Sequence, residues 1–504
     1  MTDVLTIRDT PVKLQHADRL FIGGDWVLPT SGSGFDIIDS ATEQPFYRVA
    51  EAGPADMDAA ITAARYAFDH TDWPLLEPAE RAVYLRRLAA GLRERSDEAA
   101  TYWTRQAGPL FAMSSMSISR VPAAFEAYAD LADTYPWIVP EQSQMASFAA
   151  VVAEPIGVVG AIVPWNTPLS LAGHKLGPAL ISGCTVVLKL PPEAPGELLV
   201  LAEVAAEIGL PPGVLNVVTA GREVSEQLVR DARVDKIAFT GSSAVGTRIA
   251  SICGERLARY TLELGGKSAA VVLDDYDIAA AAAAITGQEI SLTGQNCSSL
   301  TRVIVLKHRH DEFADALGSA FGAVRVGDPF DPDSQMGPLA MSRQRDRVQE
   351  YIKKGVADGA TLVSGGGVPD HLDRGYYVEP TVFANVDNAS TIAQEEIFGP
   401  VVSIIPADSE EHAIELANGT VFGLNSAVFT NDVDRAWHVA RRLRAGTVGH
   451  NGFKTDSQVG FGGVKQSGYG REGGARGVGP YVEPKTVLFN DTPTRFREQN
   501  GGAR

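Results

Sequence analysis

The sequence contains few cysteines, no recognisable leader and no clear membrane-spanning run. Three cysteines among 504 residues cannot form a complete disulfide framework, which favours a reducing compartment. No CxxC pair occurs and no Cys/His cluster has zinc spacing, so we expect no metal site. Met1–Thr10 contains two aspartates and no apolar core, so no signal peptide is predicted. We therefore expect a cytoplasmic protein.

Positive charge is also scarce, because 44 basic residues face 62 acidic ones and the net charge is −18. This balance argues against nucleic acid or an anionic membrane as a partner, since phosphate binding needs a positive surface. The longest uncharged run, Pro155–Gly173, contains three prolines and an asparagine. Such a run is more typical of a buried strand and a turn than of a membrane helix.

What the sequence does contain is an alternation of strand and helix patterns, found twice. Short apolar runs rich in valine and isoleucine predict strands buried on both faces, at Gly157–Val163, Thr185–Leu188, Leu215–Val218, Lys236–Phe239, Ala269–Leu273, Thr301–Val305 and Ser403–Pro406. Apolar positions three and four residues apart predict helices at Pro54–Phe68, Pro78–Arg95, Leu169–Ile181, Pro195–Ile208, Ile278–Thr286, Asp311–Phe321, Ser342–Asp358 and Glu410–Asn418. The alternation indicates two doubly wound α/β units.

Two glycine motifs are candidates for binding a dinucleotide. Gly468, Gly470 and Gly473 have GxGxxG spacing but follow no predicted strand, so we interpret them as a turn. Phe239–Gly246 (FTGSSAVG) follows a predicted strand and leads into a helix, whose first N–H groups could hold a pyrophosphate. An ordinary capped turn between strand and helix explains this second motif equally well.

Two residues are candidates for chemistry. Cys297 has polar neighbours (LTGQNCSS) at the end of a predicted element, which suits a nucleophilic thiolate, although a cysteine that simply packs is the alternative. We expect Cys184 and Cys253 to pack in the core. Glu263 lies between two leucines at a strand end, where a raised pKa would make it a general base; an exposed glutamate is the alternative.

These pieces resemble the aldehyde dehydrogenase superfamily from about Leu20 to Val487. Six motifs occur in the family's order: PWNTPL at Pro164–Leu169, FTGSSAVG at Phe239–Gly246, LELGGKS at Leu262–Ser268, GQNC at Gly294–Cys297, EEIFGPV at Glu395–Val401, and GFGGVKQSGYGREGG at Gly460–Gly474. Glu263 and Cys297 are separated by the spacing found in the family. The resemblance implies NAD(P)-dependent oxidation of an aldehyde to a carboxylic acid.

The family's catalytic residues fall on four positions of this sequence. Cys297 would attack the aldehyde and form a thiohemiacetal, whose oxyanion the Asn166 amide and the Cys297 N–H would hold. Loss of hydride gives a thioester, which water activated by Glu263 would hydrolyse. Lys175 would support Asn166 and Glu263, with a purely structural role as the alternative.

The resemblance also implies NAD as cofactor, with NADP possible, bound in a variant Rossmann fold that lacks GxGxxG. Lys189 would bind the adenosine ribose, Glu396 the nicotinamide ribose, and Gly241, Ser242 and Gly246 the pyrophosphate. The full predicted set is Pro164, Trp165, Lys189, Phe239, Gly241, Ser242, Gly246, Leu264, Glu396 and Phe398. Many NAD-preferring members carry a glutamate three residues after the ribose lysine, where this chain has Pro192 followed by Glu193.

Other departures concern the substrate. Thr167 and His174 occupy positions that are aromatic in many substrate tunnels, so we expect a less aromatic tunnel. Two alternative functions are an acylating semialdehyde dehydrogenase that uses coenzyme A and a crystallin-like relative without activity. Glu263 counts against the first, because acylating members typically lack that base. The presence of Cys297, Asn166 and Glu263 counts against the second.

The predicted fold class is α/β, with two doubly wound domains and a small β interface arm. We expect the cofactor domain at residues 1–134 and 154–262, the catalytic domain at 263–456, and the arm at 135–153 and 478–494. Strand-like segments in the arm would expose edges that need a partner. A homodimer or homotetramer is therefore expected.

Overall fold

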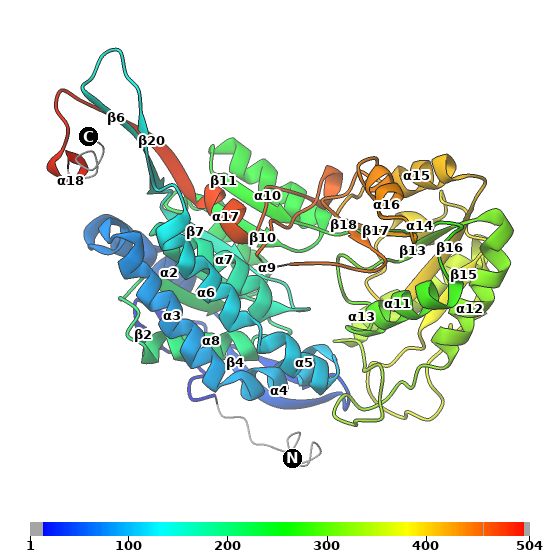
Figure 1. Cartoon of the computed structure of the whole chain (residues 1–504). Coiled ribbons are helices and arrows are strands. Elements are labelled where there is room, and N and C mark those ends of the chain that lie inside the picture. The colour runs from blue at the N-terminus through cyan, green and yellow to red at the C-terminus, as the bar shows by residue number, and fades with distance from the viewer. Residues whose placement is uncertain (1–13, 457, 498–504) are drawn as a thin grey trace.

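The computed structural model describes residues 14–456 and 458–497, so the prediction for Met1–Thr10 concerns residues outside these ranges. Two large sheets lie side by side, and a narrow arm projects from the first (Figure 1). No helix within the described ranges is long and apolar enough to cross a membrane.

The first sheet has eight strands in the order β19-β11-β10-β7-β8-β9-β1-β2. Its parallel centre consists of β7 (Val158–Ile162), β8 (Thr185–Leu190), β9 (Leu215–Thr219), β10 (Lys236–Thr240) and β11 (Arg259–Glu263). Antiparallel strands flank it: β1 (Leu20–Ile22), β2 (Asp25–Val27) and β19 (Gly468–Tyr469). The four strands predicted in this half of the chain are all present, with ends shifted by one or two residues.

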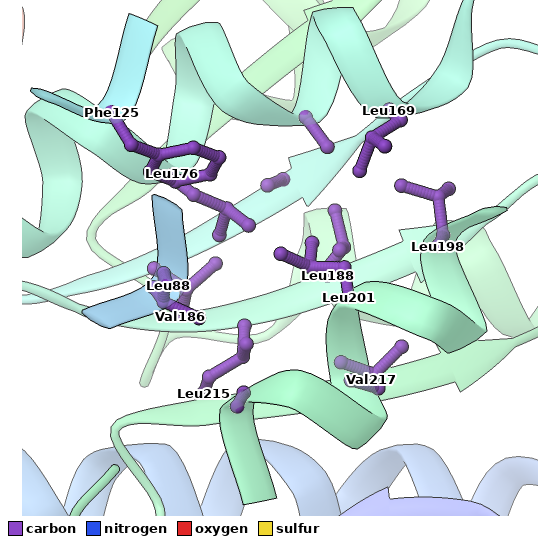
Figure 2. Packing of buried hydrophobic residues seen from close by; sticks show 14 of the residues in the cluster. Leu88, Phe125, Leu169, Leu176, Val186, Leu188, Leu198, Leu201, Leu215 and Val217 are labelled. Carbon is purple, nitrogen blue, oxygen red and sulfur yellow. The ribbon is translucent and has the colours of Figure 1, made fainter. Parts of the chain in front are cut away.

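Helices cover both faces of this sheet, as the uninterrupted apolar strands predict. Val186 and Leu188 point to one face, where they pack with residues of α7 (Pro168–Ser182) and α8 (Gly196–Glu207) (Figure 2). Val187 points to the other face, toward α2 (Pro54–His70). Helix α7 continues through Pro178, although a proline has no N–H group to donate within a helix. Each buried leucine or valine contributes about 1.5–3 kcal/mol of transfer free energy.

Further helices complete these two layers. The face of α7 and α8 also carries α3 (Pro78–Glu94), α4 (Ser96–Ala107), α5 (Phe111–Ile118) and α6 (Val121–Thr134). The face of α2 carries α9 (Arg222–Arg230) and α10 (Ser243–Glu255). A two-stranded sheet, β3 (Gly34–Asp39) with β4 (Gln44–Ala50), lies beside α4.

The second sheet has seven strands in the order β14-β15-β16-β13-β12-β17-β18. The strands are β12 (Ala269–Val272), β13 (Arg302–Leu306), β14 (Thr361–Ser364), β15 (Thr381–Ala384), β16 (Val401–Ala407), β17 (Asn425–Phe429) and β18 (Thr447–His450). One face packs on α11 (Ile278–Ile290) and α12 (His310–Gly322). The other packs on α13 (Ser342–Ala357), α15 (Glu410–Asn418) and α16 (Val433–Ala440). The prediction of two doubly wound units is confirmed.

The projecting arm is a three-stranded antiparallel sheet in the order β20-β6-β5 (Figure 1). It consists of β5 (Ile138–Glu141), β6 (Phe148–Pro155) and β20 (Val482–Phe489). Strands β5 and β20 lie within the predicted stretches 135–153 and 478–494, whereas β6 ends two residues beyond 153, at Pro155.

The order of strands determines where a ligand can bind. β7 and β10 are neighbours, but the chain continues from β7 toward β8 on one side and from β10 toward β11 on the other. In open α/β sheets, ligands bind beyond the carboxyl ends of the strands at such a reversal of direction. Pro164–Asn166 follow β7, and Gly241 follows β10.

Substitution of Gly468 tests whether β19, the edge strand next to β11, requires glycine at its first residue. This residue pairs with Glu263 and has φ 151°, and a Cβ there would lie 2.2 Å from the Leu262 carbonyl oxygen. We predict that Gly468→Ala lowers the thermal midpoint, because the backbone conformation alone costs about 1–3 kcal/mol for any other residue. Thermal unfolding followed by circular dichroism measures the change.

Gly254→Ala is the matched control. Gly254 lies in α10 with open space around the position of a Cβ, and alanine favours helices. The control should leave the midpoint unchanged or raise it. Equal midpoints for the two variants would contradict the role given to Gly468.

Candidate active site

A cavity of about 850 Å³ lies between the two sheets. Ten of the residues predicted for the site line it: Pro164, Trp165, Asn166, Gly241, Ser242, Glu263, Leu264, Cys297, Glu396 and Phe398. Four others are not among the lining residues: Lys175, Lys189, Phe239 and Gly246. The fold therefore gathers segments that are far apart in the sequence around one enclosed space.

The connection between β7 and α7 contributes Asn166. This side chain is 7% exposed, and its Nδ2 donates to the Gln295 backbone carbonyl at 3.0 Å. A primary amide has two N–H donors, so one remains for a ligand. Asn166 thus presents a fixed donor beside the loop that carries Cys297.

Cys297 lies in the loop between α11 and β13. The chain turns sharply before it, with positive φ at Thr293 (55°) and Gly294 (70°). A Cβ at Gly294 would lie 2.2 Å from the backbone of Gly399, so this turn requires glycine. The Cys297 Sγ lies 3.8 Å from the Asn296 Oδ1. The turn directs the thiol into the cavity wall opposite the first sheet.

The surroundings of Cys297 favour a protonated thiol. Burial, with the Glu396 and Glu263 carboxyls adding to it, raises the pKa of the thiol to about 12. The sequence suggested a thiolate on the basis of polar neighbours alone. The structure surrounds the thiol with acidic groups, so a proton must leave before Cys297 can act as a nucleophile.

Glu263 is the last residue of β11 and is 3% exposed. Burial raises the pKa of its carboxyl well above the usual range, and the nearby Glu472 carboxylate adds to the increase. Lys175 and Arg471 act in the opposite direction. The alternative of an exposed strand-end glutamate is wrong, and the site contains a carboxyl group suited to proton transfer near neutral pH.

Lys175 lies in α7 and is fully buried. Its ammonium donates to the Thr240 Oγ1 at 2.7 Å and to the Glu472 carboxylate at 2.6 Å. Asn166 and Glu263 were its expected partners, so the structure adds Glu472 to the site. Glu472 falls inside the last glycine-rich motif, but its 297-residue separation from Lys175 gave no local signal.

The carboxyl end of β10 forms the part of the cavity suited to a phosphate. Ser242 caps α10 by accepting from the Val245 N–H at 3.4 Å, which leaves the first N–H groups of the helix near the cavity. Gly246 packs so closely on Leu264 that a Cβ would lie 2.4 Å from that side chain. A Cβ at Gly241 would lie 2.4 Å from the Phe239 ring. Both glycines are therefore needed for this packing.

Glu396 and Phe398, which precede β16, lie in the cavity lining together with Trp165, which follows β7. Glu396 accepts from the Gly266 N–H at 3.1 Å, and burial raises the pKa of its carboxyl to about 7. A Cβ at Gly265 would lie 2.5 Å from this carboxylate, so the glycine leaves the space in front of it open. Trp165 and Phe398 meet edge to face, with ring centroids 5.4 Å apart. These features fit a ribose and a flat ring.

Basic residues that the sequence analysis did not identify also line the cavity. They are Arg120, Arg222, Arg343 and Arg347. Lys189, at the end of β8, is buried, which lowers the pKa of its ammonium to about 8, whereas Glu193 acts to raise it. Positive charge thus gathers locally in an acidic protein, as binding of a phosphate requires.

Polar residues of α7 and of the position before it belong to the cavity lining, beside the apolar Leu171. They are Thr167, Ser170 and His174, and burial lowers the pKa of the His174 imidazole. The expectation of a less aromatic tunnel rested on two of these residues, and both line the cavity.

Comparisons with known proteins agree on one family. Residues 26–487 match the model of the aldehyde dehydrogenase family. The chain is 43% identical over 472 residues to geranial dehydrogenase from Castellaniella defragrans, covering 94% of this chain and 98% of that protein.

Solved structures give the same result. An aldehyde dehydrogenase from Mycobacterium tuberculosis complexed with NAD⁺ is 44% identical with a TM-score of 0.91, covering 94% of this chain and 98% of that one. A variant of aldehyde dehydrogenase C from Pseudomonas syringae, complexed with NAD⁺ and octanal, is 35% identical with a TM-score of 0.92. The match covers 96% of this chain and 99% of that one.

The buried pair of Lys175 and Glu472 yields a stability prediction. Removing one partner of a buried ion pair leaves an uncompensated charge, so Lys175→Met should lower the free energy of unfolding by about 3–5 kcal/mol. The double variant K175M/E472L should recover much of this loss, because no unpaired charge remains. Urea denaturation measures both.

Arg86→Met serves as the control, because Arg86 pairs with Asp130 on the surface, where both side chains are largely exposed. An exposed pair contributes little, so this variant should unfold close to the wild type. A loss as small in K175M as in R86M would contradict the structural weight given to Lys175.

Proposed function

Since the chain belongs to the aldehyde dehydrogenase family, we propose that it oxidises an aldehyde to a carboxylic acid with NAD⁺, using Cys297 as nucleophile. One observation carries the proposal: Cys297, the Asn166 amide and the Glu263 carboxyl meet in a single cavity that also has a nucleotide-binding end. These three groups are sufficient for the two chemical steps of the reaction.

The first step forms a bond between the Cys297 sulfur and the aldehyde carbon. The thiol proton is released to solvent, and the carbonyl oxygen becomes an oxyanion. The Asn166 Nδ2 and the Cys297 backbone N–H are the donors that hold this oxyanion. An N–H group placed in advance at this position lowers the barrier, because it need not reorient as the charge develops.

The second step releases the acid. A bound NAD⁺ would supply the hydride acceptor, and loss of hydride from the former aldehyde carbon would turn the thiohemiacetal on Cys297 into a thioester. Glu263 takes a proton from water, the water oxygen attacks the thioester carbon, and the carbon–sulfur bond breaks. The acid departs and Cys297 recovers its thiol.

Each group of residues proposed to bind NAD⁺ suits a different part of the dinucleotide. The start of α10, with Gly241 and Ser242, suits the pyrophosphate, and Glu396 suits a ribose hydroxyl. Lys189 is the group proposed for the adenosine ribose. Trp165 and Phe398 provide an apolar wall near Cys297.

Glu193 supports a preference for NAD over NADP. Pro192 replaces the glutamate typical of NAD-preferring members, but the Glu193 carboxylate acts on Lys189 and pairs with Arg343. A carboxylate at this place would repel the 2′-phosphate of NADP. We therefore place the selectivity in Glu193 rather than in position 192.

The buried position of Glu263 favours hydrolysis over transfer to coenzyme A, since it holds a base next to the thioester. A role without catalysis is not favoured, because the nucleophile, the amide donor and the base share one cavity.

We also propose that the protein forms a homodimer or homotetramer through the arm. The edge strands β5 and β20 expose Val139, Leu488 and Phe489, which a second copy would cover. We propose the domain division that the sequence predicts, with the cofactor domain at residues 1–134 and 154–262, the catalytic domain at 263–456 and the arm at 135–153 and 478–494. Three free cysteines agree with a cytoplasmic location.

The function is tested by NADH formation from a panel of aldehydes without coenzyme A. We expect turnover by the wild type and none by Cys297→Ala, because only Cys297 has its thiol in the cavity. Cys253→Ala is the control and should retain activity, since Cys253 is buried in α10 against the first sheet and does not line the cavity. Strict dependence on coenzyme A, or activity in C297A, would contradict the proposal.

Glu263→Gln should stop the reaction at the thioester. We expect a rapid burst of NADH followed by a steady rate about 10²–10⁴-fold lower, because the general base is lost.

The pH dependence of kcat is a second test of Glu263 as the general base. A raised pKa keeps the carboxyl protonated, and inactive as a base, to a higher pH than usual. The wild-type kcat should therefore rise with pH through an apparent pKa well above that of an ordinary glutamate, and E263Q should lack this limb. An unchanged steady rate in E263Q would refute the assignment.

A further inference from the structure

A buried tryptophan holds the backbone of Asn166. Trp103 lies in α4, on the side of the first sheet covered by α7, and is 2% exposed. Its indole Nε1 donates to the Asn166 carbonyl oxygen at 2.7 Å. An indole has one donor and no acceptor, so this bond uses its entire hydrogen-bonding capacity.

The same helix also holds the loop that carries Cys297. The Gln295 Nε2 donates to the carbonyl of Ala107, the last residue of α4, at 3.0 Å. The Gln295 Oε1 accepts from the Ala340 N–H at 2.9 Å. Trp103 and Ala107 are four residues apart, one turn along the same face of the helix. Helix α4 therefore contacts both sides of the proposed oxyanion site.

These hydrogen bonds fix a segment of backbone that no helix or strand holds in place. Asn166 belongs to neither β7 nor α7, and its neighbour Thr167 has φ −143° and ψ 58°, outside both regular conformations. On the helix side, the Glu197 carboxylate accepts from the Leu169 N–H at 3.0 Å. At Asn166 itself, the indole bond fixes the main chain and the Gln295 carbonyl fixes the amide.

We propose that Trp103 is a positioning residue, which sets the Asn166 amide at the distance and angle needed to hold the oxyanion on Cys297. The proposal rests on the oxyanion role of Asn166 proposed above. Trp103 does not line the cavity, so it acts through Asn166 rather than on the substrate. Displacement of a catalytic group by about 1 Å can cost 10²-fold in rate, which makes such a support matter.

Trp103→Phe tests the proposal by removing the indole N–H while keeping an aromatic ring. We expect kcat to fall about tenfold, as a partial loss of one oxyanion donor implies, with an unchanged KM for NAD⁺. If this variant does not fold, 3-benzothienylalanine at position 103 keeps the bicyclic shape and replaces only the N–H with sulfur.

Trp73→Phe is the matched control. Trp73 is also 2% exposed, belongs to the same apolar cluster, and donates from its indole to the Cys184 carbonyl at 3.0 Å. Both variants lose one buried indole hydrogen bond, so both should lose similar thermal stability. Only W103F should lose kcat. An equal effect of the two substitutions on kcat would overturn the proposal.

A double-mutant cycle with Asn166→Ala separates the two proposals. If Trp103 acts through Asn166, W103F should lower kcat no further in an N166A background. Multiplied effects in W103F/N166A would show independent action and overturn the positioning role, while leaving the proposed function intact. Full activity in N166A would instead overturn the oxyanion assignment itself, and the positioning role with it.

Discussion

The hydrogen bond from the Asn166 amide to the Gln295 carbonyl is the contact on which the site depends. It joins the segment after β7, in the first sheet, to the loop before β13, in the second. The two sheets lie side by side (Figure 1). The cavity between them is lined by the amide donor from the first and by the thiol from the second. Helix α4 contacts both partners, through Trp103 and Ala107, so a helix outside the cavity is bonded to both of them.

Burial determines the protonation of the site as much as its shape. Removal from water raises the pKa of both Cys297 and Glu263, and the acidic neighbours of each add to the effect. Burial therefore favours the protonated form of both groups. Lys175, which is buried, partly offsets this by pairing with Glu472, which lines the cavity. The nucleophile and the base thus become active only when a proton is removed, which couples reactivity to pH and to what the cavity contains.

The sequence predicted the two α/β units because buried strands have a strong local signal, and helix Glu410–Asn418 has the predicted ends. The motifs that indicated Cys297, Asn166 and Glu263 lie in loops and strand ends that the fold brings into one cavity. Glu472 and Trp103 could not be found this way, because their contacts join residues far apart in the chain. The protonated state of Cys297 was also out of reach, since it depends on acidic groups from other segments.

The central claim is that the acyl group forms a thioester on Cys297 and that Glu263 is the general base for its hydrolysis. Intact-protein mass spectrometry of E263Q, after mixing with NAD⁺ and an aldehyde that the wild type oxidises, tests it most directly. The account predicts one added mass per chain, equal to the aldehyde less two hydrogens, located by digestion on Cys297 and absent from C297A/E263Q. An unmodified chain after NADH has formed, or the same adduct on another residue, would contradict it.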